Sequence, residues 1–157
     1  MSRSRRGGNA IEISLTLPVF LLVLFALMDY AWFFYHEAMS IEITRQGCRV
    51  GSVTPNFDAA TGTAIGGDAS PSAQAAVDFI EQSLIEQGLV TTVAINTDPA
   101  SADGFVGVSA TVSAATGTGD PDTISCDTFY EFVPLVGFLP VLPSEVGTSA
   151  TYRLELP

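Results

Sequence analysis

The longest feature of the hydrophobic pattern is an uncharged, mainly apolar run over residues 13–28. As a helix this run covers about 24 Å, which is short of the ~30 Å hydrocarbon core of a bilayer. Extending it through Asp29 and YAWFFYH reaches spanning length and places Tyr30, Trp32 and Tyr35 in an aromatic belt at the headgroups. The pattern therefore predicts a transmembrane helix with Asp29 near its outer interface.

No helix breaker appears between this run and Gly47. We expect one helix over about residues 9–50, roughly 60 Å long, half in the bilayer and half outside it as a spine. Residues 51–70 are rich in Gly, Ser, Thr and Ala without a sustained period, which is typical of a linker or surface loop.

A second helix is predicted after this linker. Ser70 suits an N-cap, Pro71 suits the first helical position, and Gly88 suits a helix end. The apolar face of this helix would comprise Ala73, Val77, Ile80 and Leu84.

From Leu89 the hydrophobic period changes to two, which predicts strands with one buried face. These strands are LVTTVAI at 89–95, FVGVSATVS at 105–113, TFYEFV at 128–133 and TSATYRLEL at 148–156. Their inward residues would include Val106, Val108, Ala110, Val112, Ala150, Tyr152, Leu154 and Leu156. The predicted fold class is α+β: a long N-terminal helix, then a small domain with one amphipathic helix packed on an antiparallel sheet of about four strands.

One apolar segment fits none of these elements. PLVGFLPVLP, at residues 134–143, contains three prolines, which exclude regular structure. It is interpreted either as a loop lying over the sheet as a lid on the core, or as an exposed patch for a neighbouring subunit.

The distribution of charge predicts the orientation of the transmembrane helix. The formal net charge is −11, from seventeen acidic residues and six arginines, so nucleic acid is an unsuitable partner. Arg3, Arg5 and Arg6 precede the apolar run, which predicts a cytoplasmic N-terminus and an exported C-terminal domain. Acidity is expected of a solvated exported domain, and it assigns no function by itself.

Two residues are unusual for a plain membrane anchor. Glu12 stands at the entry of the apolar run, where burying a carboxylate is costly unless it has a partner. Pro18 lies inside the run and removes the hydrogen bond to the carbonyl of Ser14, a loss that packing against neighbouring helices can compensate.

The stretch RRGGNAIEISLTLPVFLLVLFALMDY resembles the N-terminus of TadE-like proteins, pseudopilins of tight-adherence pilus systems within the wider group of type IV prepilins. The C-terminal ending, an apolar proline-containing stretch before ATYRLE, is similar as well. In that group a membrane peptidase cuts after a glycine, and a glutamate is the fifth residue of the mature chain. Cleavage after Gly7 would give Glu12 this place, and cleavage after Gly8 would make it fourth. The residue after the glutamate is often aromatic in the family, and here it is Ile13.

The resemblance implies a pilin-like organisation: a leader over 1–7, a transmembrane and spine helix over 8–50, and an exported α+β domain over 51–157. It also implies that the new α-amino group pairs with Glu12, about one helical turn away. The expected partners are a prepilin peptidase, other pilin or pseudopilin subunits and the bacterial inner membrane. The subunit either stays in that membrane or enters an extracellular pilus.

The two cysteines, Cys48 and Cys126, would both lie in an oxidising space with this topology. We expect a disulfide rather than two free thiols. It would close a loop of roughly 80 residues and stabilise the fold by ~4 kcal/mol. Two cysteines and one distant histidine do not make a metal site.

The sequence offers no catalytic dyad, and we expect neither enzymatic activity nor a cofactor. The single histidine, His36, is interpreted as an interfacial residue. Asp120, Asp122 and Asp127 are predicted to lie in one loop, where they either cap a turn or bind calcium without the EF-hand spacing.

Three functions follow from these patterns. The first is a pseudopilin that acts by packing in pilus assembly, with a minor role because the major pilins of such systems resemble much smaller chains. The second is an uncleaved bitopic envelope protein whose exported domain binds a partner. The third is a secreted binding domain, released by signal peptidase near AMS at 38–40.

Overall fold

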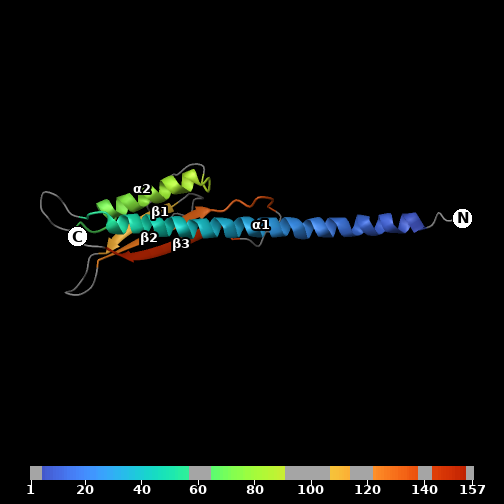
Figure 1. The fold of residues 1–157 in the computed structure, drawn as a ribbon, viewed down its shortest axis with the longest axis horizontal. Helices are drawn as coiled ribbons and strands as arrows, with labels where there is room; N and C mark the ends of the chain where they lie inside the picture. The colour runs from blue at the N-terminus through green and yellow to red at the C-terminus, as the bar shows by residue number, and fades with distance from the viewer. Residues whose placement is uncertain (1–4, 57–64, 91–106, 114–121, 138–142, 155–157) are drawn as a thin grey trace. The chain divides into compact units, whose positions relative to one another are not determined.

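The computed structural model describes residues 5–56, 65–90, 107–113, 122–137 and 143–154, without the side chains of residues 5–11. The elements are α1 (Arg5–Val53), α2 (Pro71–Glu86), β1 (Gly107–Ser113), β2 (Thr123–Glu131) and β3 (Glu145–Arg153). Figure 1 shows the two helices and the sheet. The predicted α+β class with a long N-terminal helix is confirmed, with three described strands where about four were expected.

The chain divides into two compact units. The first, the helix unit, consists of residues 1–35 and 133–142, and the second, the sheet unit, consists of residues 36–132 and 143–157. Helix α1 contributes to both units, because it extends from Arg5 to Val53 and the units meet between Tyr35 and His36. Neither Pro18 nor Gly47 interrupts the helix.

The sheet of the sheet unit is an antiparallel meander in the order β1, β2, β3. Its register places Cys126 of β2 between Ala110 of β1 and Ala150 of β3. Alternate residues of β1 and β2 are buried, as the period of two predicts. The buried apolar side chains of the three strands are Val108, Ala110, Val112, Ile124, Cys126, Tyr130 and Val146.

Helix α2 covers part of this sheet and contacts β1 and β2. Its N-terminus is capped as expected: the Ser70 hydroxyl accepts the backbone N–H of Ala73 at 3.2 Å, and Pro71 occupies the first turn. Ile80 and Leu84 are fully buried. After the helix, Gly88 adopts φ +67°, a left-handed conformation that favours glycine and ends the helix.

Two glycines of α1 allow α2 to approach closely. A Cβ on Gly47 would lie 2.2 Å from Cγ1 of Ile80, and one on Gly51 would lie 2.7 Å from the carbonyl oxygen of Ser72. Since side chains cannot occupy this space, the two glycines set the spacing of the helices.

The structure corrects several predicted bounds. The strand expected at 128–133 is β2, which begins five residues earlier, at Thr123, and ends at Glu131. Helix α1 continues three residues into the predicted linker, to Val53. Residues 91–95 of the first predicted strand, Val106 and Leu156 lie outside the described residues.

Candidate functional site: the apolar surface of the N-terminal helix

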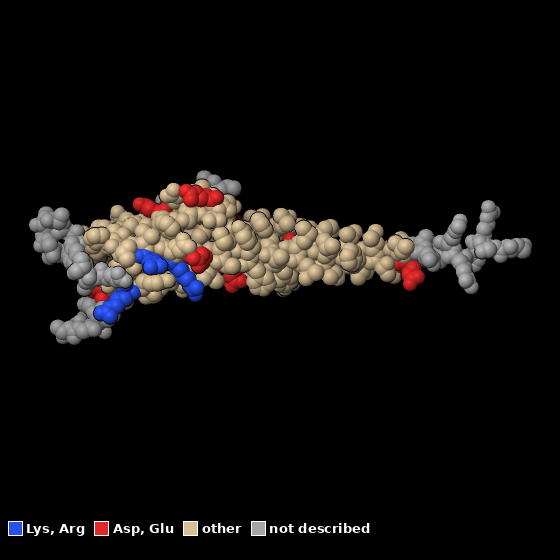
Figure 2. Space-filling model, in the orientation of Figure 1, with Lys and Arg blue, Asp and Glu red and all other residues tan. Residues whose placement is uncertain are grey.

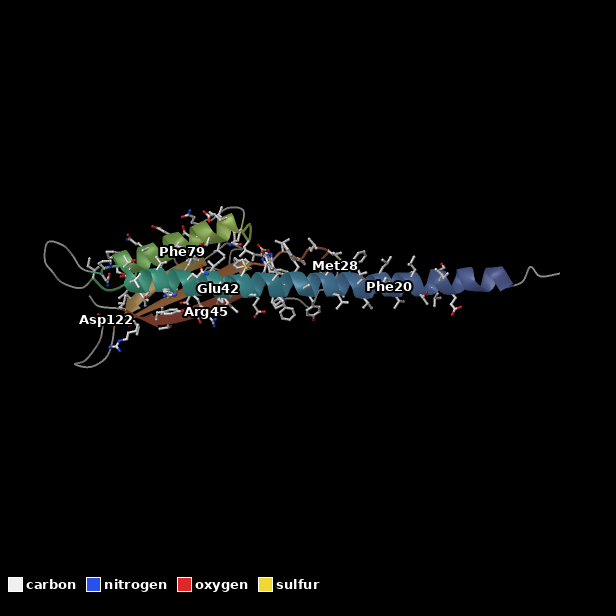
Figure 3. All side chains as sticks on the ribbon, viewed as in Figure 1. Phe20, Met28, Glu42, Arg45, Phe79 and Asp122 are labelled. Atoms are coloured by element: carbon white, nitrogen blue, oxygen red, sulfur yellow. A yellow bond between two sulfur atoms is a disulfide. The ribbon has the colours of Figure 1, made fainter. Side chains whose placement is uncertain are left out.

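The N-terminal part of α1 exposes large apolar side chains around its whole circumference. Every residue from Val19 to Phe25, seven in a row and almost two helical turns, is exposed. Figure 3 shows Phe20 and Met28 on the outside of the helix, and Figure 2 shows a long surface free of charge along its visible face. Among the described residues, α1 is the one helix long and apolar enough to cross a membrane. This surface suits lipid or neighbouring helices and not water.

Glu12 lies at the start of this surface, and its side chain is exposed. Gly7 and Gly8 are part of the same helix, so Gly8 and Glu12 stand one turn apart on one face. The hydroxyl of Thr16 donates to the backbone carbonyl of Glu12 at 2.9 Å. This bond satisfies a polar group that otherwise would face an apolar medium.

Pro18 occupies the interior of α1, and the helix continues on both sides of it. Its nitrogen carries no hydrogen and cannot donate to the carbonyl of Ser14. Both residues are exposed, so this carbonyl is accessible to a donor from outside the helix.

Asp29 is the acidic residue farthest along the apolar part of the helix, and it is fully buried. Its Oδ1 accepts the backbone N–H of Val136 at 2.8 Å. Both residues belong to the helix unit, although 107 positions separate them in the sequence. The carboxylate is thus engaged by the apolar segment and does not face the surface.

Aromatic rings follow Asp29 on the same helix. Tyr30 stacks on Phe34 with ring centroids 6.3 Å apart, and Trp32 stacks on Tyr35 at 5.7 Å. Tyr30 and Tyr35 are exposed. An aromatic belt at the outer end of a spanning helix stays a prediction for these rings.

Past Tyr35, α1 presents a polar row to the sheet within the sheet unit. The row consists of His36, Ser40, Thr44 and Cys48, all buried and spaced by four residues. Such spacing places them on one face of the helix. This row was not among the sequence-based predictions, although its signal, a small or polar residue at every fourth position, is visible in the chain.

Each member of the polar row contacts the sheet. The carbonyl of His36 accepts the Tyr130 hydroxyl at 3.0 Å, and burial raises the pKa of that hydroxyl to about 12. Ser40 bonds Thr148 through the two hydroxyls at 2.5 Å, and Thr44 bonds Thr128 at 3.0 Å. The ring of His36 is buried against Tyr130 and Phe132, and its position at the membrane interface stays a prediction.

Cys48 completes the row with a covalent bond. Its sulfur is joined to that of Cys126 on β2, with the two Cα atoms 5.8 Å apart and a sequence separation of 78. The expected disulfide is confirmed, and it ties α1 to the central strand.

The three aspartates considered for calcium do not share one loop. Asp127 lies within β2, paired with Ser109 and Ser149 in the register, and points away from the buried face. Asp122 directly precedes β2, and its carbonyl accepts the Leu154 N–H at 2.9 Å. Asp120 lies outside the described residues, so its role stays untested.

The described part of the apolar segment favours one of its two interpretations. Val133, Leu135 and Val136 are exposed, and residues 133–137 belong to the helix unit. This exposure favours the interpretation as an exposed patch.

One family model matches the N-terminal part of the chain. The model of the TadE-like protein family matches residues 7–49, which cover most of α1. The comparisons with curated proteins and with solved structures found no match. The resemblance to the TadE-like family is thereby confirmed for this part of the chain, and it indicates a pilus-associated protein of tight-adherence systems.

Proposed function

We propose that this chain is a pseudopilin or minor pilin of a tight-adherence, type IV-like pilus. It is inserted in the bacterial inner membrane with its N-terminus in the cytoplasm, and a prepilin peptidase removes residues 1–7. The observation that carries the proposal is the family match over residues 7–49, on a helix with an apolar surface exposed around its circumference.

The function rests on packing, and TadE-like proteins are a structural kind of protein. In the membrane, lipid covers the apolar surface of α1. In an assembled filament, the same surface packs against neighbouring subunits, and their side chains offer donors to the exposed carbonyl of Ser14. The partners are therefore the peptidase and other pilin or pseudopilin subunits.

Glu12 has a specific role in this proposal. Cleavage between Gly7 and Gly8 creates an α-amino group one helical turn before Glu12. The positive amine and the carboxylate attract each other strongly in an apolar setting, within one chain or between neighbours. Pairing removes the cost of placing Glu12 beside lipid.

The release of a soluble domain near AMS, at residues 38–40, fits the structure less well. Ser40 is fully buried, and its hydroxyl is bonded to Thr148 of β3. A cut there would remove His36, and with it the hydrogen bond that the Tyr130 hydroxyl donates to the His36 carbonyl. The fold therefore favours retention of this helical turn.

The intact mass of the chain recovered from membranes tests the proposal. Processing predicts the loss of residues 1–7, an uncleaved bitopic protein predicts no loss, and signal peptidase predicts the loss of about forty residues. Gly7→Ala should block cleavage because the side chain occupies the site of the cut, whereas Gly8→Ala is the control and should still be processed. A wild-type chain that keeps Arg3, Arg5 and Arg6 would contradict the proposal.

A further inference from the structure

Residues 133–137, the described start of the apolar segment, form a loop that follows directly on β2. The backbone N–H of Phe132 donates to the carbonyl of Ser144 at 2.8 Å, directly beyond the last pair of β2 and β3. The loop over residues 133–137 belongs to the helix unit. Gly137 has φ +70°, which lets the chain turn where other residues would be strained.

The contact with Asp29 indicates how deep this loop lies in a bilayer that α1 spans. Asp29 follows Glu12 by seventeen residues, or about 26 Å along the helix. With Glu12 at the inner boundary of the ~30 Å hydrocarbon core, Asp29 lies just inside the outer boundary. Because Asp29 accepts the N–H of Val136, this part of the loop lies at the same level.

The exposed side chains of the loop are apolar, as a position just inside the outer boundary of the hydrocarbon core requires. Val133 is 70% exposed, Leu135 56% and Val136 45%. The same unit exposes Leu27 and Met28 on the helix, two and one positions before Asp29. Residues 132–143 contain no charged side chain, so nothing in this stretch of sequence opposes insertion.

We propose that residues 133–137 insert into the outer leaflet, as a second membrane contact beside α1. The occupant of this apolar surface is lipid acyl chain, because the loop is bonded to the spanning helix at Asp29 and exposes apolar side chains at the same level. The buried carboxylate of Asp29 holds the loop at this depth by satisfying a backbone N–H that has no water partner there. The proposal requires α1 to span a bilayer, but it does not depend on cleavage at Gly7 or on pilus assembly.

Tryptophan fluorescence of the full chain in phosphatidylcholine vesicles tests this contact. Leu135→Trp is made in a Trp32→Phe background, and the vesicles contain lipid brominated on the acyl chain near the headgroup. The matched control is Ile85→Trp in the same background, because Ile85 is similarly exposed, at 49%, but lies in the sheet unit. We expect blue-shifted emission and strong quenching by brominated lipid for Leu135→Trp, and unquenched emission for Ile85→Trp.

Two results would overturn the proposal. Emission from Leu135→Trp that is unquenched and matches the Ile85→Trp control would place the loop in water. The alternative occupant is a neighbouring subunit. It would be identified by blue-shifted emission that brominated lipid does not quench, if the blue shift is lost when the protein is diluted in lipid.

Variants of Asp29 test the role of the carboxylate. Asp29→Asn keeps an oxygen that accepts the Val136 N–H, so quenching of Leu135→Trp should persist. Asp29→Leu removes the acceptor, and quenching should fall toward that of the control. An intact Cys48–Cys126 disulfide, read by gel mobility with and without reductant, shows that each variant has folded. Equal quenching in both variants would contradict the role of Asp29.

Discussion

Gly51 of α1 lies directly against the backbone of Ser72 at the start of α2. A Cβ on Gly51 would meet the Ser72 carbonyl oxygen at 2.7 Å and Cδ1 of Ile124 at 2.6 Å. A backbone oxygen cannot move aside as the end of a flexible side chain can. The contact therefore needs glycine at position 51.

Gly51→Ala should destabilise the fold by about 1–3 kcal/mol, because overpacking outweighs the gain of up to ~1 kcal/mol in helix propensity. Denaturant unfolding of the full chain in detergent measures this change. Gly147→Ala is the matched control, since no atom of the described residues, apart from its chain neighbours, lies within 4 Å of a Cβ at this position of β3. Equal stability of the two variants would show that α2 can move away from α1.

Replacing Cys48 and Cys126 together by serine should lower the free energy of unfolding by ~4 kcal/mol, since the bond closes a long loop in the unfolded chain. Unfolding curves of the wild type and the variant give this difference, and wild type in reductant should resemble the variant. Under denaturing conditions without reductant, a thiol reagent should leave the wild type unlabelled. Labelling would show that the bond is absent.

The pair Thr44 and Thr128 should behave non-additively. Thr44→Val or Thr128→Val alone leaves the other buried hydroxyl without this partner, at a cost of about 1–3 kcal/mol. The double variant removes both hydroxyls and should cost less than the sum of the two single variants. A double-mutant cycle from denaturant unfolding measures the coupling, expected at about 0.5–3 kcal/mol. Simple additivity would mean that the hydroxyls do not support each other.

The stability of the fold should depend on pH through the carboxyl group of Glu81. Burial, and then the charge of Asp78, raise the pKa of the Glu81 carboxyl above its ordinary value of 4.5. Its Oε1 is buried without a hydrogen-bond partner among the described residues. A raised pKa in the folded state means that Glu81 stabilises the fold below pH 4.5, and that this contribution is lost as pH rises through the folded value.

Glu81→Gln should therefore be more stable than wild type at neutral pH, and this advantage should shrink as pH falls through and below the folded pKa. Asp78→Asn removes the smaller of the two causes and should give a smaller gain. Thermal unfolding across this pH range measures both. A Glu81→Gln variant that is less stable than wild type at neutral pH would contradict the prediction.

Glu12→Ala should leave the processed chain in the membrane without entry into filaments or complexes, because the new amine loses its partner. Glu37→Gln removes a charge from the same helix beyond the apolar surface and should not affect incorporation. Immunoblots of sheared filaments and membrane fractions measure the distribution. Normal incorporation of Glu12→Ala would contradict the proposed pairing.

The elements that could be predicted are those with a local signal. Ser70, Pro71 and Gly88 mark the two ends of α2 by their own chemistry, and the inward residues of β1 alternate without interruption. The disulfide could be predicted because the chain has only two cysteines and both were expected in an oxidising compartment.

The remaining features depend on contacts between distant parts of the chain. The start of β2 was missed because Asp122 and Asp127 favour a turn locally, while the pairing of β2 with strands on both sides makes the region extended. The polar row of α1 has a regular spacing, but its meaning depends on hydroxyls of β2 and β3. Likewise, nothing near Asp29 in the sequence points to Val136.

The bond between Cys48 and Cys126 determines how the subunit would carry tension in a filament. A pull on the N-terminal helix reaches Cys48 and passes through the two sulfur atoms into the central strand. The segment between the two cysteines, which includes α2, lies outside this covalent path because Cys126 follows Cys48 by 78 positions. Traction on such a pilus would therefore spare the intervening loops from stretching, and a reduced subunit would extend under a load that the oxidised one resists.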